Sequence, residues 1–429
     1  MTTQAPNAEP ACPGSADAGT ARSRQDLPAA TVALHARRCA FDAIPRATWD
    51  ELAGRNPWAT PFSSWAFQRA WWDAYGASAH DQTLIVTADP SETEDPTVAP
   101  GDIVAIVPLM HRHEVEPGDA DTASRIRHGA DADLTPVAPT AKAVFFGASY
   151  HADYATILAA PEDLPAVATA LADHFADESA ADPDHPAPWD VIDLRRLRCG
   201  DPAADALSAA LGRREIDAAW TLNLEREDVC PVVTIPDGTF EDYLDTLDKK
   251  ARHEIRRKFR RAGGSGEIVF AVAPEPLAEL DVFIDLHQSK WGADGLFPPT
   301  PGGDASRLFL RRWFEESGPD GPVRLLFLSV GGRRIAAGIL VTDHDRLMFY
   351  NAGSDPTALD LSPGVLLAGE CIRLAAAEGK RKFDFLRGNE PYKYTWGAVD
   401  EPIQRLLVRR DGPSGEPAQG TAAAVEVGA

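Results

Sequence analysis

The chain has 429 residues, 44% of them hydrophobic, which is enough for two domains with separate cores. Its formal net charge of −23 makes the overall surface repel nucleic acid and anionic membranes, so an anionic ligand needs a local basic site. Five cysteines without CxxC spacing favour free thiols over a disulfide framework or a zinc site. Neither a secretory signal nor a run of about 18 apolar residues is present. These features predict a cytoplasmic protein without a membrane span or a bound metal.

The sequence predicts two domains, residues 29–228 and 229–410, between disordered tails at 1–28 and 411–429 that are rich in Ala, Pro, Gly, Ser and Thr. Aromatic residues between Trp49 and Tyr75 occur at helical spacing, and we interpret them as core packing. The later elements expected in the first domain are strands at 82–87, 103–110, 143–146, 189–194 and 216–224, and helices at 164–175 and 203–211.

The second domain opens with a predicted amphipathic helix from Thr239, which forms a capping box with Asp242, to Gly263-Gly264. Its outer face is basic, which indicates either a solvated face or a phosphate-binding surface. The basic residues are Lys249, Lys250, Arg252, Arg256, Arg257, Lys258, Arg260 and Arg261. Further helices are expected at 277–291 and 307–314, and strands at 323–330, 335–342, 347–350 and 403–409, the last closing the sheet of this domain.

Residues 359–396 form the most informative stretch. Ser362 is a good N-cap, Pro363 suits the first helical position, and the helix is expected to end at Gly379. A helix that begins with small residues leaves backbone N–H groups exposed, so an anion can bind there. A short apolar strand at 383–386 follows, and then a polar and aromatic loop at 391–396. Helix start and strand end are predicted to form one site.

An internal repeat supports the division into two domains. Both halves are predicted to run helix, helix, three strands, helix, strand and a closing strand. The segment 191–195 (VIDLR) resembles 383–387 (FDFLR). Before the long helix, however, the first half has Pro161-Glu162-Asp163, whose carboxylates would repel a phosphate. Only the second half is therefore expected to bind an anionic cofactor.

The chain resembles the GNAT superfamily of acyl-CoA N-acyltransferases in its tandem, Fem-like form, and most of all the acetyltransferases associated with cellulose biosynthesis. In the second half the resemblance rests on Tyr243-Leu244, Arg256-Arg257, His287 with Trp291, Ser362-Pro363-Gly364, residues 383–388, Tyr392-Lys393 and Trp396. In the first half it is looser, through Pro57, Trp71-Trp72, Pro108-Leu109 and residues 193–195.

The resemblance implies an α/β fold of two tandem GNAT-like domains, each a mixed central sheet flanked by helices, with the first domain degenerate. It implies transfer of an acetyl or other acyl group from acyl-CoA, a co-substrate, to an amine of a small-molecule, saccharide or peptide acceptor. The usual longer glycine pattern at the pyrophosphate-binding helix is absent, and Ser362-Pro363-Gly364 takes its place. Fem-like relatives use aminoacyl-tRNA, which is the second hypothesis, although the net charge argues against nucleic acid. A non-catalytic acyl-CoA-binding module is the third.

The resemblance also implies roles for single residues. The expected cofactor-binding residues are Ser362, Gly364, Val365, Tyr350, whose strand would supply an N–H to the thioester carbonyl, and Arg256. Tyr392 is the expected acid for the leaving thiolate, or else a core aromatic.

Two carboxylates are candidates for the general base. Asp384, in an apolar strand, is either that base or half of an ion pair with Arg387 or Lys393, and Glu390 is either the base or an exposed loop acid. The expected substrate-binding residues are Arg387, Lys393, Trp396 and His287, of which Lys393 could instead cap the loop and His287 could be a core histidine.

Overall fold

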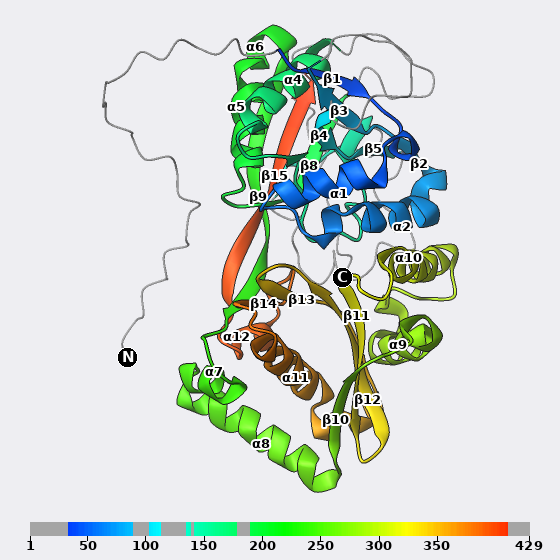
Figure 1. The fold of residues 1–429 in the computed structure, drawn as a ribbon, viewed down its shortest axis with the longest axis vertical. Coiled ribbons are helices and arrows are strands. Elements are labelled where there is room, and N and C mark those ends of the chain that lie inside the picture. The colour runs from blue at the N-terminus through cyan, green and yellow to red at the C-terminus, as the bar shows by residue number, and fades with distance from the viewer. Residues whose placement is uncertain (1–32, 89–102, 113–133, 139–140, 178–188, 411–429) are drawn as a thin grey trace, which may run out of the picture.

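The computed structural model describes residues 33–88, 103–112, 134–138, 141–177 and 189–410 (Figure 1). Both predicted tails, 1–28 and 411–429, lie outside the described residues. The chain forms two α/β halves, one above the other in Figure 1, and a mixed sheet of 11 strands runs through both. The predicted fold class, α/β with helices flanking a mixed sheet, is confirmed.

The first half contains the strands β1 (His35–Arg38), β2 (Ala79–Asp81), β3 (Leu84–Thr87), β4 (Ile103–Val107), β5 (Leu109–Arg112), β6 (Ala143–Phe146), β7 (Leu158–Ala159) and β8 (Val191–Arg198). Its helices are α1 (Arg46–Arg55), α2 (Trp65–Tyr75), α4 (Leu164–Asp177), α5 (Pro202–Arg213) and α6 (Glu215–Ala218).

The second half contains the helices α7 (Phe240–Thr246), α8 (Lys249–Ser265), α9 (Pro276–Trp291), α10 (Pro301–Ser317), α11 (Pro363–Ala377) and α12 (Pro391–Tyr394). Its strands are β10 (Ile268–Val272), β11 (Val323–Val330), β12 (Arg333–Thr342), β13 (Arg346–Ser354) and β14 (Lys382–Asp384). Two long strands, β9 (Trp220–Thr234) and β15 (Val399–Arg410), extend through both halves (Figure 1).

Each half is completed by the closing strand of the other. The strand order is β10-β11-β12-β13-β14-β9-β15-β8-β6-β5-β2, so β9, which follows the first half, pairs with β14. In the same way β15, at the end of the second half, pairs with β8. The prediction that residues 403–409 close the sheet of the second domain is therefore wrong, because they pair with β8 in the first. The predicted domain boundary at residue 228 falls inside β9.

The predicted repeat is visible in the strand pairing. Each half contains one parallel pair of strands: β6 with β8 in the first half, and β13 with β14 in the second. In both pairs the connecting helix, α4 or α11, lies between the two strands in sequence, as a parallel connection requires. Phe145 lies opposite Asp193, and Met348 lies opposite Asp384, so these two aspartates occupy equivalent positions.

The aromatic segment of the first half joins the two halves, and its interpretation as core packing is confirmed. Trp71 and Phe67 are fully buried. The ring of Phe67 contacts Trp313 of α10 edge-on, with centroids 5.0 Å apart. One hydrophobic cluster includes residues of both halves, so the halves share a continuous interface.

The predicted helix at 239–262 is two helices. The capping box of Thr239 and Asp242 is present, but α7 ends at Thr246. Asp248 then caps α8, because its side chain accepts hydrogen bonds from the N–H groups of Lys250 and Ala251. This second N-cap allows a turn that helical periodicity alone does not reveal. Gly263-Gly264 do not end the helix, which continues to Ser265.

Three further expectations need correction. Residues 215–218 form α6, so the strand predicted from 216 begins at Trp220, and β10 was not predicted. Residues 391–394 form a short helix, α12, within the predicted loop. Cys39, Cys230 and Cys371 are free thiols as predicted.

Candidate functional site

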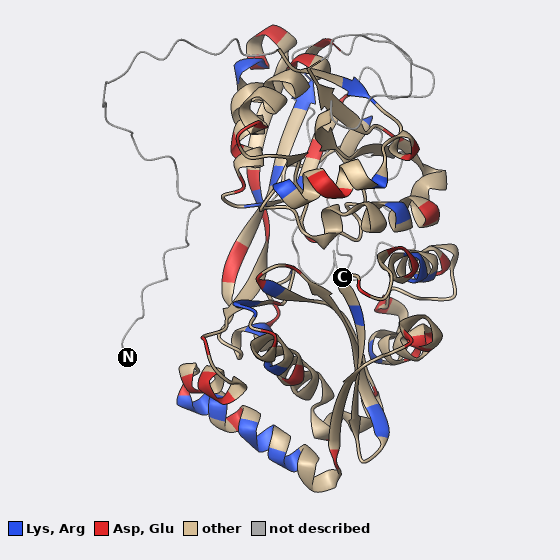
Figure 2. Ribbon diagram, viewed as in Figure 1, with Lys and Arg blue, Asp and Glu red and all other residues tan. Residues whose placement is uncertain are grey.

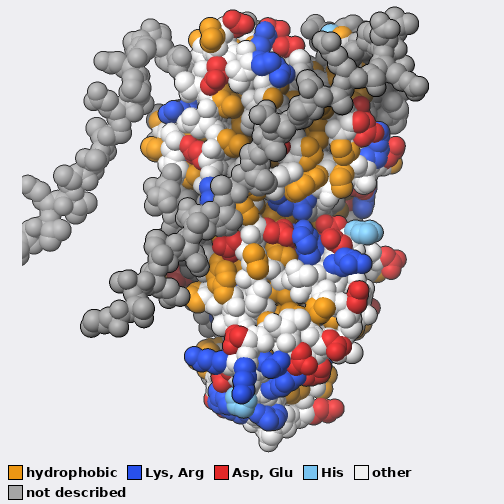
Figure 3. Space-filling view, turned by 90° about the vertical axis from the view of Figure 1, so that its left-hand side faces the viewer, with side chains coloured by type: hydrophobic (Ala, Val, Ile, Leu, Met, Phe, Trp, Pro, Cys, Tyr) orange, Lys and Arg blue, Asp and Glu red, His pale blue; other side chains and the backbone are white. Residues whose placement is uncertain are grey.

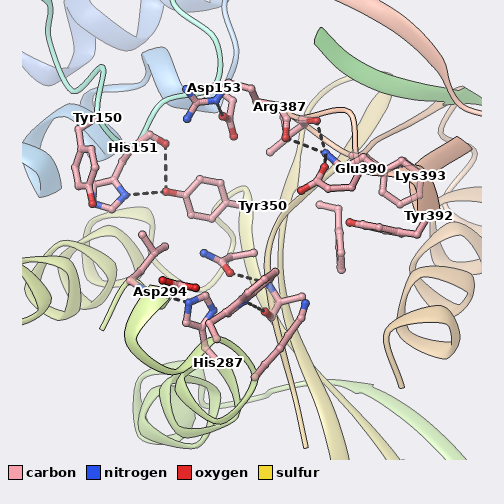
Figure 4. Close-up of a pocket in the computed structure, with 18 residues that line it drawn as sticks. Tyr150, His151, Asp153, His287, Asp294, Tyr350, Arg387, Glu390, Tyr392 and Lys393 are labelled. Carbon is pink, nitrogen blue, oxygen red and sulfur yellow. Dashed lines mark hydrogen bonds and ion pairs between the residues drawn. The ribbon is translucent and has the colours of Figure 1, made fainter. Parts of the chain in front are cut away.

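A pocket opens where β13 and β14 separate (Figure 4). The two strands pair only from Arg346 to Met348 on β13 and from Lys382 to Asp384 on β14. Beyond Asp384 the chain stays with β9, since the N–H of Phe385 donates to the carbonyl of Pro231. Residues 349–352 of β13 and 385–387 after β14 therefore face each other across a gap and line the pocket.

A β-bulge places Tyr350 at this gap. Ile339 of β12 pairs with Asn351 and Leu340 pairs with Phe349, so Tyr350 is the extra residue of β13. A bulge reorients a side chain relative to the regular alternation of a strand. Tyr350 lines the pocket, and its hydroxyl donates toward the backbone carbonyl of His151 at 3.2 Å.

The first half supplies one wall of the pocket through the segment after β6 (Figure 4). Tyr150, His151 and Asp153 line it, and the carboxylate of Asp153 lies 3.3 Å from the guanidinium of Arg387. None of these three residues is among the site residues predicted from the sequence. The sequence did contain a signal for them. A polar and aromatic segment, Tyr-His-x-Asp-Tyr, follows the buried strand β6, and β6 is the counterpart in the first half of β13, which carries pocket residues.

The loop after β14 carries four of the predicted residues at the pocket, and one of them, Lys393, holds the loop together. The Lys393 ammonium is buried, donates to the carbonyls of Leu386, Arg387 and Gly388, and pairs with Glu390 at 2.9 Å. Lys393 thus caps the loop, which was one of its two expected roles. Tyr392 is 42% exposed and lines the pocket, with its ring edge-on against Phe385. Arg387, Glu390, Tyr392 and Lys393 are therefore brought together.

Asp384 lies behind the pocket and does not line it. Its carboxylate accepts hydrogen bonds from the Tyr154 hydroxyl, the Arg346 guanidinium and the N–H of Leu386, each at 2.8 Å. The predicted partners, Arg387 and Lys393, are wrong. Burial raises the pKa of Asp384, and the positive charge of Arg346 opposes that rise.

The equivalent aspartate of the first half is also paired with a buried arginine. Asp193 is buried and accepts two hydrogen bonds from the buried guanidinium of Arg405, at 2.7 and 2.8 Å. Each half therefore carries a buried Asp–Arg pair at the same place in its sheet. Because the first half was expected to be degenerate, this repetition favours a structural role for both pairs.

His287 and Trp396 occupy different places. His287 is buried on α9, lines the pocket, and its Nε2 accepts a hydrogen bond from the N–H of Leu296 at 3.2 Å. Trp396 is buried in the core on the α11 side of the sheet and does not line the pocket. Its carbonyl accepts a hydrogen bond from the Tyr243 hydroxyl.

The predicted anion site at the start of α11 is only partly available. Ser362 is in the left-handed conformation (φ 58°) and its side chain does not cap the helix. The N–H of Val365 already donates to the carbonyl of Ser362, so it is not free to bind an anion. At Gly364 the space that a Cβ would fill is empty, with no atom within 4 Å. The helix start is therefore open to solvent at Gly364.

Arg256 lies apart from the pocket on the exposed face of α8, the blue stripe at the lower end of Figure 2. Its guanidinium pairs with Glu241 at 2.7 Å and with Asp245 at 3.2 Å. At its other end, α8 approaches the turn before α11, because Arg261 lies 3.8 Å from Asp360. The basic face thus extends toward the start of α11, but Arg256 itself does not reach it.

Among the described residues, no group of three or more His, Cys, Asp or Glu could hold a metal ion. Within the same residues, no helix combines the length and apolar composition that crossing a membrane requires.

Comparisons with known proteins agree with this geometry. Residues 249–394 match the family model of the acetyltransferase (GNAT) domain. The fold is similar to the crystal structure of FemX, with a TM-score of 0.52 and 10% identity over 84% of this chain and 96% of that one. It is also similar to a conserved protein of unknown function from Bacteroides thetaiotaomicron, with a TM-score of 0.50 and 13% identity over 86% and 98% of the two chains. No curated protein matches the sequence.

Proposed function

Because this chain is a GNAT-superfamily protein of the tandem, Fem-like form, we propose that it is an acyl-CoA-dependent N-acyltransferase. The donor would be acetyl-CoA or another acyl-CoA, and the acceptor an amine of a small molecule, a saccharide or a peptide. Residues 229–410 would bind the donor, and residues 29–228 would form the acceptor side of the pocket.

The observation that carries the proposal is the separation of β13 from β14 over a pocket lined by both halves. A thioester placed in this gap would have its carbonyl beside β13 and its sulfur toward the loop after β14. The amine nitrogen would attack the carbonyl carbon, and collapse of the tetrahedral intermediate would expel the CoA thiolate. Tyr392, partly exposed at the pocket, would donate its proton to that thiolate.

Of the two proposed bases, Glu390 lines the pocket and Asp384 does not, which favours Glu390. Its carboxylate is paired with Lys393, so it would have to exchange that partner to accept a proton. Arg387 and His287 also line the pocket and remain candidates for holding the acceptor.

Ligand-induced stabilisation tests the proposal. A ligand at about 100 times its dissociation constant adds roughly 2.7 kcal/mol to the free energy of unfolding. We expect thermal shifts with acetyl-CoA, longer acyl-CoAs or free CoA. Gly364→Val should remove the shift and leave the fold intact, because a side chain there covers the helix start where the pyrophosphate would approach.

Gly263→Val is the matched control, since Gly263 also lies in a helix with nothing within 4 Å of its missing Cβ. It should leave the shift unchanged. CoA binding by Gly364→Val as tight as by the parent would place the pyrophosphate elsewhere.

A second candidate, transfer from aminoacyl-tRNA, is favoured by one feature, the basic face of α8 that forms a cluster at the lower end of the molecule in Figure 3. Ion pairs with acidic residues offset five of its eight cations, which weakens it as a polyanion site. Binding of acyl-CoA without turnover of any amine offered would instead indicate a non-catalytic module.

A further inference from the structure

A chain of hydrogen bonds leads from the pocket into the interface between the halves. The hydroxyl of Tyr350 lies 3.3 Å from Nδ1 of His151 (Figure 4). On the other side of the imidazole, Nε2 lies 2.8 Å from the Tyr75 hydroxyl, which in turn lies 2.9 Å from the hydroxyl of Ser306. Both ring nitrogens of His151 therefore face a phenol, one at the pocket and one away from it.

The imidazole is held in a single orientation. His151 is only 8% exposed, and its ring stacks on Phe309 of α10 with centroids 4.2 Å apart and planes 8° apart. Tyr350 comes from the second half and His151 from the first, so the arrangement exists only when the halves are docked. A fixed, buried imidazole bonded to a pocket phenol is more than core packing requires.

We propose that Tyr350 and His151 form a proton relay that deprotonates the acceptor amine. Tyr350 is the catalytic residue, since its hydroxyl faces the pocket, and His151 is a positioning residue that holds this hydroxyl and receives its proton. The relay rests on the proposed acyl transfer.

The protons balance as follows. When the amine nitrogen bonds to the acyl carbon, the amine loses one proton to Oη of Tyr350. The Tyr350 hydroxyl lies within reach of two acceptors, the carbonyl of His151 at 3.2 Å and its Nδ1 at 3.3 Å, and it must turn from the carbonyl to Nδ1 for the relay. As it takes the amine proton, Tyr350 passes its own proton to Nδ1 of His151, which becomes an imidazolium. In the resting state Nδ1 must be unprotonated, so the neutral ring carries its proton on Nε2 and donates it to Tyr75.

Tyr350 needs His151 for this role. Burial, with a smaller effect of Asp153, raises the pKa of Tyr350 well above its usual value, so the phenolate is not available near neutral pH. The titratable and charged groups around the pair are Tyr75 from α2, Tyr150 and Asp153 from the segment after β6, and Arg387 from the loop after β14. From α10, Ser306 and Phe309 complete the surroundings.

The tautomer of His151 tests the relay without any substrate. In protein with ¹⁵N-labelled histidine, the His151 signals are identified by their loss in His151→Gln. We expect a neutral ring protonated on Nε2 near pH 7.5. A ring protonated on Nδ1, or an imidazolium at this pH, would overturn the relay.

Kinetics provide the second test. Tyr350→Phe and His151→Gln should each lower kcat about 10²-fold with little change in the KM of the donor. The double variant should be little worse than either, because both remove one proton path. The fall of kcat/KM toward acid pH, which reports protonation of His151, should disappear in His151→Gln. His344→Gln, the same change at an exposed turn, should leave the profile unchanged.

Suppose that the wild-type enzyme transfers acyl groups. The relay would then be excluded if the two single variants kept the wild-type rate, or if their losses multiplied in the double variant, and the proposed function would still stand. A wild-type protein that neither binds nor uses acyl-CoA would exclude the proposed donor, and the tautomer measurement would then decide on the relay.

Discussion

Tyr392 and Tyr394 lie two residues apart on α12 but have different surroundings. Both are partly exposed, at 42% and 38%. Tyr392 lines the pocket, whereas the Tyr394 hydroxyl donates to Asp400 at 2.8 Å, outside it. Burial and this hydrogen bond raise the pKa of Tyr394, so its proton is held more firmly than that of an ordinary tyrosine. The two residues therefore make a matched pair for testing the acid.

Tyr392→Phe should lower kcat about 10²-fold or more with little change in the KM of the donor, because only the proton for the leaving thiolate is lost. Steady-state kinetics with the parent, Tyr392→Phe and Tyr394→Phe measure this. The Tyr394 variant should keep its rate. Equal rates for all three proteins would reduce Tyr392 to a packing role, and Glu390 would be tested next.

Asp384→Asn should affect stability more than chemistry. The change leaves the buried Arg346 without its closest carboxylate, and breaking a buried ion pair costs about 3–5 kcal/mol. Urea unfolding should show this loss, while kcat of the folded fraction changes less than about tenfold.

Asp193→Asn, at the equivalent position of the first half, should be destabilised to a similar extent. An Asp384→Asn protein that keeps its stability but loses activity by about 10²-fold or more would restore Asp384 as a base.

At the scale of elements, the pocket depends on close contact between α9 and β13. A Cβ on Gly353 would lie 2.3 Å from the backbone nitrogen of His287, so only glycine lets the helix approach this strand. Helix α9 carries three pocket residues, His287, Lys290 and Trp291. The distance between helix and strand therefore sets the width of the pocket on this side.

Gly353→Ala should destabilise the protein by about 1–3 kcal/mol and lower activity, because the helix backbone must move away from the strand. Calorimetry and steady-state rates measure both effects. Gly263→Ala is the control: it lies in α8 with open space at its Cβ, and alanine should be neutral or stabilise by about 0.5–1 kcal/mol. Parent-like stability of Gly353→Ala would contradict the packing argument.

At the scale of the whole molecule, the charge distribution decides between the two donors. The net charge of the chain is −23, yet α8 contains eight Lys and Arg residues and one acidic residue, Glu254. A tRNA would have to bind along this helix while the remaining surface repels it. The 3′-phosphate of CoA needs only a few of these cations.

We expect no tRNA binding in a gel-shift assay at physiological salt, and only a shallow dependence of acyl-CoA affinity on salt. A tRNA contact releases counterions, so log K would fall against log salt with a slope of roughly −0.7 for each single-strand phosphate contacted. A steep slope with aminoacyl-tRNA, lost on changing Arg256 and Arg257 to Ala, would support the second candidate function instead.

Local patterns in the sequence were sufficient for much of the fold. Residues 143–146 and 323–330 were predicted with the bounds of β6 and β11, because buried apolar runs between turn signals are a local property. The stretch 359–396 likewise predicted α11, β14 and the loop that brings Arg387, Glu390, Tyr392 and Lys393 to the pocket. Spacing along one chain segment determines such features.

Only the tertiary structure decided which distant groups meet. Tyr154 bonds to Asp384 across 230 positions, and β15 pairs with the first half instead of its own. His151 and Asp153 joined the site in the same way, through the docking of two halves. No periodicity or cap encodes such contacts, because each depends on the packing of two segments that are far apart in sequence. Sequence alone therefore determined the elements and the family resemblance, and the tertiary structure decided the partners of each polar group in the pocket.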